Sequence, residues 1–179
     1  MKYVDIESRF GDVTLRVTPV PHPWDPEADR PGWDVQLTGH DLDASGVYVE
    51  DDEAPQTLVE FCRELADEHK GFDGEKRWES AGGELEIRAD HDHVNTTRLY
   101  VTLAGGPTPR WSASAELHVD PLRFDRVYKN LELYGGEVLS GEVEAGAEPQ
   151  RIDPREPRKK IGTPPTRQDP HDQVGDRTA

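Results

Sequence analysis

The sequence predicts a two-layer α+β domain, in which about seven mostly antiparallel strands form one sheet that two helices cover. Three observations support this fold class. Apolar and polar residues alternate in seven short segments, apolar residues recur at helical spacing in two others, and residues 141–179 contain six prolines but almost no large apolar side chain. Alternation places one face of a strand in the core and the other in water, which is typical of antiparallel sheets.

Four strands are expected before the first helix. Val4 and Ile6 alternate with polar residues in the first of them. The other three are predicted within residues 12–18, 33–39 and 45–50. The loop 19–31 carries five prolines and Trp24. Because a long loop in a compact domain needs an anchor or a function, Trp24 either holds this loop on the domain or contacts a partner.

The first helix is predicted within residues 54–71, where apolar residues from Leu58 to Leu65 recur at i, i+3, i+4 and i+7. Acidic residues at 51–53 precede it, and Gly71 follows as a stop. Cys62, which is the single cysteine, falls on the apolar stripe. We therefore expect a buried, unreactive thiol and a reducing compartment.

Three more strands are expected within residues 84–90, 98–104 and 111–119. Trp33, Trp78 and Trp111 start or precede strands at inward positions, so all three are predicted to lie in the core. Short polar loops join consecutive strands, which favours pairing between neighbours in a meander.

The second helix is predicted from Asp120, an N-cap residue, through Pro121 in the first turn to a stop at Gly135-Gly136. The acidic α+β domain is thus expected to span residues 1–137. Residues 138–179 are predicted to form a disordered tail, because so few apolar residues cannot offset the entropy of ordering.

The formal net charge is −16, and residues 41–92 hold 17 acidic against 5 basic residues, which leaves −12 there. Such a surface repels nucleic acids and anionic membranes and attracts a basic protein. Charge that only maintains solubility, or an adaptation to a salty cytoplasm, is the simpler alternative. The expected binding face consists of Trp24 and eight acidic residues. These are Asp41, Asp43, Glu50, Asp51, Asp52, Glu53, Glu60 and Glu64.

The densest group of potential metal ligands is Asp90–His93, within "ADHDHVN". His91 and His93 are two residues apart, so in a strand their side chains could lie on the same face. His118, on the strand after the next, could be a third ligand. Zinc sites need three or four protein ligands. However, the segment connects two predicted strands and ends in Asn95, as turns often do. The sequence therefore favours a hairpin turn over a metal site, and no cofactor is expected.

Acidic residues on the polar faces of strands raise the possibility of carboxylate catalysis. Glu84, Glu86 and Glu116 share such faces with Arg88 and Arg98. A catalytic carboxylate needs burial in a cleft, whereas cross-strand ion pairs explain these residues without one. The sequence also contains no Walker, G-x-S-x-G or H-E-x-x-H motif.

The segment "HKGFDGEKRWES" at 69–80 resembles a block of the domain-of-unknown-function 6228 family (DUF6228) of small bacterial proteins. The matching residues are Gly71, Phe72, Asp73, Gly74, Trp78 and Ser80, followed by Trp111 and the helix from Pro121. The resemblance covers roughly residues 33–134, and it implies a helix, several strands and a closing helix. The layout is also similar to small immunity proteins, which implies a non-enzymatic acidic protein that blocks a basic toxin domain.

These observations lead to one main hypothesis and two alternatives. The main hypothesis is a cytoplasmic, non-enzymatic module that binds a basic protein through its acidic face. The likeness to immunity proteins implies a toxin domain as this partner. The first alternative is a metal-dependent or small-molecule enzyme that uses His91, His93 and His118 on the exposed sheet face. The second is an acid-adapted housekeeping domain without a stable partner. The first segment, "MKYVDIESRFGDV", has no apolar run typical of a secretory signal.

Overall fold

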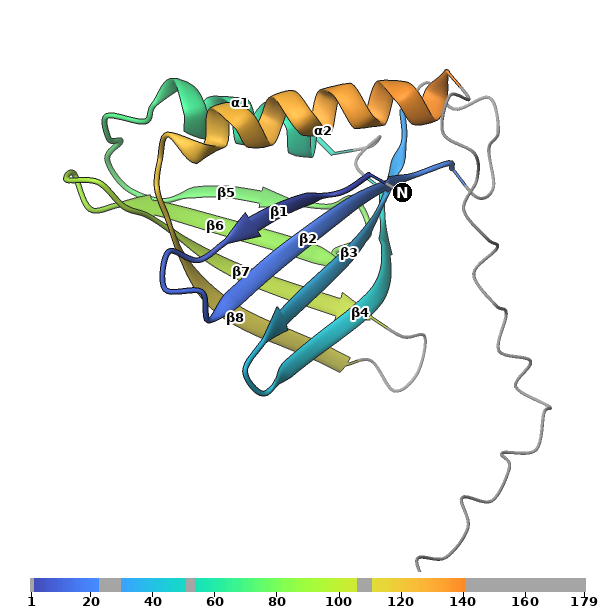
Figure 1. Cartoon of the computed structure of the whole chain (residues 1–179), viewed down its shortest axis with the longest axis horizontal. Helices are drawn as coiled ribbons and strands as arrows, with labels where there is room; N and C mark the ends of the chain where they lie inside the picture. The colour runs from blue at the N-terminus through green and yellow to red at the C-terminus, as the bar shows by residue number, and fades with distance from the viewer. Residues whose placement is uncertain (1, 23–29, 51–53, 106–110, 141–179) are drawn as a thin grey trace, which may run out of the picture. The chain divides into compact units, whose positions relative to one another are not determined.

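Eight strands form two separate four-stranded antiparallel sheets, and two helices lie side by side along them (Figure 1). The computed structural model describes residues 2–22, 30–50, 54–105 and 111–140, all of which belong to one unit, residues 1–147. The first sheet has the order β1 (Val4–Glu7), β2 (Val13–Val20), β3 (Gly32–Gly39) and β4 (Leu42–Val49). The second has the order β5 (Lys76–Glu79), β6 (Leu85–His91), β7 (Thr97–Gly105) and β8 (Trp111–Val119).

The prediction of a single sheet of about seven strands is wrong, although the α+β class and the antiparallel meanders are confirmed. Alternation tells which face of a strand is buried but not where a meander is interrupted, and here the first helix separates β4 from β5. The strand that was missed, β5, has four residues, of which only Trp78 is apolar, so it shows no alternation.

Backbone hydrogen bonds connect the two sheets at both margins. Near β1, the N–H of Arg9 donates to the carbonyl of His118 in β8 at 2.7 Å. Beyond β4, the N–H of Ala81 donates to the carbonyl of Glu50 at 3.3 Å. The inward side chains of both sheets and the apolar stripes of both helices form one continuous core. The two sheets therefore fold as one hydrophobic unit.

The first helix, α1 (Leu58–Asp67), begins with a capping box. The Thr57 hydroxyl accepts a hydrogen bond from the N–H of Glu60 at 3.2 Å, and the Glu60 carboxylate accepts one from the N–H of Thr57 at 2.8 Å. These two bonds satisfy backbone donors that a helix start leaves unpaired. The predicted stripe is confirmed, since Leu58, Phe61, Cys62 and Leu65 are all buried.

The second helix, α2 (Arg123–Leu139), starts later and ends later than expected. Asp120 caps the turn before the helix, because its carboxylate accepts the N–H of Leu122 at 3.0 Å. The helix also continues through Gly135 and Gly136 to Leu139, two residues beyond the expected domain boundary. A Cβ atom on Gly135 would lie 3.0 Å from Cγ of Pro31. Glycine therefore permits a close contact here and does not act as a stop.

Two of the three tryptophans expected in the core are there. Trp33 and Trp78 are buried, whereas Trp111 is 38% exposed, so that prediction was wrong. Trp111 lies opposite Gly105 in the register of β7 and β8, and its ring occupies the space that a side chain at Gly105 would need. The first half of β8 is not covered by the core, which leaves this ring partly in water.

Residues 51–53 and the tail from 141 onward lie outside the described residues, so the predictions made for them stay predictions. Within the described part of the chain, no helix is both long and apolar enough to cross a membrane.

The two adjacent glycines of α2 give a matched test of this packing. Gly136→Ala should raise the free energy of unfolding by about 1 kcal/mol, because alanine is the better helix former and nothing lies within 4 Å of the new methyl group. Gly135→Ala should gain clearly less, or lose stability, because its methyl group must displace Pro31. Urea unfolding of both variants measures this difference, and equal gains would contradict the contact.

Candidate functional site

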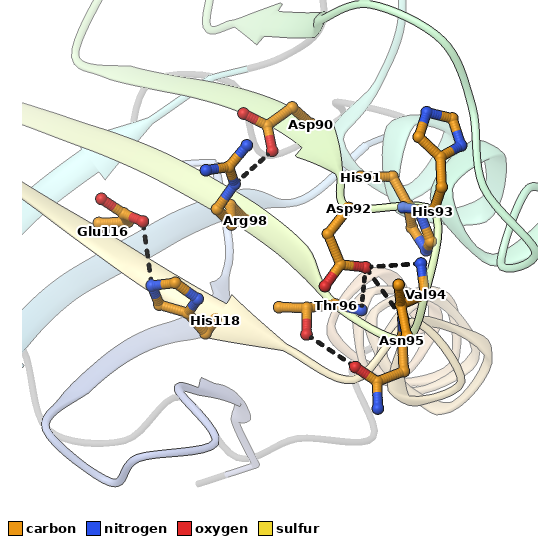
Figure 2. A network of polar contacts seen from close by, with 10 residues as sticks. All are labelled: Asp90, His91, Asp92, His93, Val94, Asn95, Thr96, Arg98, Glu116 and His118. Atoms are coloured by element: carbon orange, nitrogen blue, oxygen red, sulfur yellow. Dashed lines mark hydrogen bonds and ion pairs between the residues drawn. The ribbon is translucent and has the colours of Figure 1, made fainter.

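The segment between β6 and β7 is a hairpin loop organised by Asp92. The Oδ1 atom of Asp92 accepts hydrogen bonds from the N–H groups of Val94, Asn95 and Thr96, each at 2.9 Å (Figure 2). The N–H of Asp92 donates to the carbonyl of Thr96 at 3.0 Å. Hydrogen bonds from Thr96, Val94 and Asn95 stabilise the carboxylate and hold the pKa of Asp92 well below its usual range. The predicted turn is confirmed.

The two histidines of this hairpin have different environments. His91 is buried at the end of β6, beside Phe72, and its Nδ1 accepts the N–H of His93 at 2.7 Å. In the neutral ring Nε2 therefore carries the proton. That atom is buried and has no hydrogen-bond partner among the described residues. His93 adopts a positive φ of 58°, and its exposed ring lies 3.4 Å from the Asp73 carboxylate.

His118 lies apart from both, on the outer face of the second sheet. Its Nε2 is 3.0 Å from the Glu116 carboxylate, and its ring contacts Phe10 with centroids 5.1 Å apart. Figure 2 shows His118 with Glu116 on β8, whereas His91 and His93 lie at the end of β6. The structure thus does not bring the three predicted ligands together. Within residues 2–22, 30–50, 54–105 and 111–140, no three His, Cys, Asp or Glu side chains are grouped to hold a metal ion.

The outer face of the second sheet is a ladder of charged pairs around Tyr100. Arg98 donates to Asp90 at 2.6 Å, and the Arg88 guanidinium lies 5.6 Å from the ring centroid of Tyr100. Burial on this crowded face and the nearby Asp90 carboxylate raise the pKa of Tyr100. Cross-strand pairing is therefore the main role of these charges.

The acidic residues on this face follow that expectation in part. Glu86 lies 2.9 Å from Arg77, as predicted for a cross-strand ion pair. Glu84 instead accepts a hydrogen bond from Ser80 at 3.0 Å, and Glu116 pairs with a histidine and not with an arginine. These carboxylates are all used in the ladder or in a turn.

The described acidic residues of the expected binding face lie in three places, namely the β3–β4 hairpin, the far end of β4, and α1. Asp41 and Asp43 lie at the β3–β4 hairpin, whereas Glu50 lies beyond the other end of β4, 3.4 Å from His22. Eight residues of extended strand separate the two ends by about 25 Å, roughly three Debye lengths in physiological salt. Asp51, Asp52, Glu53 and Trp24 lie outside the described residues.

On α1, the two carboxylates of the expected binding face have structural roles. Glu60 belongs to the capping box. Glu64 accepts hydrogen bonds from Lys76 and Gln56, and the Lys76 ammonium is the main cause that lowers its pKa. Asp41, by contrast, has a side chain that is 94% exposed, and Asp43 is also exposed. The hairpin tip, defined as residues 40–43, therefore holds two exposed carboxylates of the expected binding face.

Two features of the domain surface were not predicted from the sequence. On the outer face of the first sheet, burial raises the pKa of Asp34, which lies opposite Tyr48 and Thr18 in register. The second feature is a hollow of about 350 Å³, lined by Glu7, Arg9, Asn95, Asp120 and Arg123. Its residues come from three segments distant in sequence, namely the end of β1 with the turn after it, the Asp92 loop, and the start of α2. A signal in the sequence that could have pointed to this region is Phe10, an aromatic residue between the first two predicted strands.

Together, the two meandering sheets and the paired helices define an α+β domain. Residues 12–127 match the family described as "Family of unknown function (DUF6228)". The chain therefore belongs to the DUF6228 family, as the block at 69–80 suggested. No curated protein and no solved structure matches it.

The Asp92 loop gives a pH-dependent prediction. Asp92→Ala should destabilise the protein at neutral pH, because three N–H groups lose their acceptor. The folded-state pKa is lowered, so this stabilisation is complete above the unfolded-state pKa of about 3.9 and is lost as pH falls below it. The difference between wild type and variant should shrink in acid. Urea unfolding at neutral and acidic pH measures it, with the exposed Asp73→Ala as the control.

Cys62 should be unreactive while the protein is folded. Burial raises the pKa of this thiol to about 12, so almost no thiolate forms at neutral pH. Ellman's reagent should react with it only after denaturation. Rapid reaction of the native protein would show that α1 opens far more readily than its buried contacts imply.

Proposed function

We propose that this protein is a non-enzymatic binding module whose acidic surface receives a basic protein partner. The observation that carries the proposal is the hairpin tip, where Asp41 and Asp43 are exposed in a chain with a net charge of −16. Opposite charge on a partner accelerates encounter and fixes orientation. The proposed contact surface is therefore centred on this tip, and it is smaller than the face of eight acidic residues expected from the sequence.

The distribution of polar groups supports binding over catalysis. A reaction needs groups that converge on one point, with at least one held in an unusual protonation state. His118 lies apart from His91 and His93, whose ring centroids are 5.9 Å apart, and the carboxylates of the second sheet pair with neighbouring side chains.

The partner class that we propose is a basic toxin domain, and the protein would act on it in the cytoplasm as an immunity protein. Two features favour this class. The protein carries a large negative charge, and its exposed acidic hairpin is fixed at both ends by antiparallel pairing of β3 with β4. A rigid acidic hairpin can cover a basic active site without chemistry of its own.

Charge reversal at the hairpin tip tests this proposal. Full-length wild type, Asp41→Lys/Asp43→Lys and the control Asp125→Lys/Glu132→Lys are compared by affinity purification and quantitative mass spectrometry. Both double variants change the net charge equally, and the control residues are exposed on α2. A basic protein should be retained by wild type and control, and its recovery should fall about tenfold or more with the hairpin variant and with added salt. Equal recovery by all three proteins would reject the proposal.

A further inference from the structure

Three loops meet at the end of the domain where α2 begins. The first is the β1–β2 turn at 8–12, the second is the Asp92 loop at 92–96, and the third is the segment 120–123. Arg9 connects them. Its N–H donates to the carbonyl of His118 at 2.7 Å, and its guanidinium donates to Thr96 at 2.9 Å and to Asn95 at 3.4 Å. These three loops, here named the loop end, surround the 350 Å³ hollow.

The loop end carries the most exposed large apolar side chains of the described chain. Val94 is 79% exposed, and Phe10 and Leu122 are each 68% exposed. Each of them is the sequence neighbour of a residue that lines the hollow, namely Asn95, Arg9 and Arg123. Single exposed apolar residues are common on proteins, but a group of them around a polar hollow is typical of an interaction surface.

The charged side chains of the loop end differ in whether neighbouring groups already bind them. Asp92 accepts three backbone N–H groups, Asp120 accepts that of Leu122, and Glu7 lies 3.4 Å from Arg123. Arg9, in contrast, is held only by neutral oxygens among the described residues. Among the described residues no carboxylate forms an ion pair with Arg9, although Glu7 and Asp120 line the same hollow and bind other partners.

We propose that the loop end is a docking surface for a protein segment that carries an apolar side chain next to a carboxylate. The carboxylate would pair with Arg9, whose planar guanidinium can bind both oxygens at once. The neighbouring apolar side chain would be covered by Phe10, Leu122 and Val94. Aromatic and arginine residues at the centre of an apolar patch are the usual energetic centre of a protein interface.

This inference goes beyond the proposed function, because it concerns a different surface, on which Arg9 would bind a carboxylate of the partner. Charge also favours a different protein over a second copy as the occupant, since two chains of −16 repel each other. Phe10, Leu122 and Val94 are exposed and do not line the hollow itself, which suits an extended segment better than a small molecule held inside it.

The test begins with a phage-displayed library of random peptides, selected on the immobilised full-length chain. Enriched peptides should contain Asp or Glu beside a large apolar residue. Their affinity, measured by fluorescence polarisation, should fall about tenfold or more with Phe10→Ser and with Leu122→Ser. Arg9→Gln should remove the preference for a carboxylate over the matching amide. The control Leu133→Ser, an exposed apolar position on α2, should bind like wild type.

Circular dichroism and thermal unfolding check that the variants remain folded, which is expected because Phe10, Leu122 and Leu133 are exposed. Several outcomes would overturn the proposal. These are a lack of enriched peptides, equal binding to the Phe10→Ser and Leu122→Ser variants, or self-association of wild type that both variants abolish. Enrichment of basic peptides that lose affinity only with Asp41→Lys/Asp43→Lys would support the hairpin tip and reject the loop end. The two proposals can therefore fail independently.

Discussion

The structure depends on one hydrophobic core that two sheets and two helices share. Each sheet has a single apolar face, so neither could remain folded in water without the other. The core includes Leu37 and Val47 from the first sheet, Leu99 from the second, and Phe61 and Phe124 from the helices. At the margins where the two sheets meet, backbone polar groups also need hydrogen-bond partners. The backbone hydrogen bonds of Arg9 and Ala81 supply them there.

This use of the inner faces restricts where function can occur. Every inward position that supports the core is unavailable to a ligand, which leaves the outer faces, the hairpin tips and the loops at the strand ends. The outer face of the second sheet is occupied by its own charge pairs around Tyr100. Among the described residues, the exposed carboxylates of the β3–β4 hairpin and the exposed apolar residues of the loop end are the two surfaces proposed for partners.

The sequence predicted what depends on local pattern and missed what depends on tertiary contacts. Seven of the eight strands followed from alternation, and the Asp92 turn followed from its residue types. The division into two sheets could not be predicted, because alternation does not identify strand partners. The sequence predicts a helix stop at Gly135, but in the structure this glycine allows a close contact with Pro31. Local sequence does not reveal such a contact, because the two residues are far apart in the chain. The hollow at the loop end was missed for the same reason, since Arg9 meets Thr96 only after folding.

The two proposed surfaces are also neighbours, which has a physical consequence. Val13 pairs with Gly39 at the end of the first sheet, and a side chain at Gly39 would lie 2.9 Å from the carbonyl of Asp12. The β1–β2 turn and the β3–β4 hairpin therefore project from the same end of this sheet. A partner that contacts both would meet exposed carboxylates at the hairpin tip, and an arginine with apolar residues at the loop end. Such a change of charge over a short distance fixes the orientation of a partner, because the reversed arrangement places like charges together.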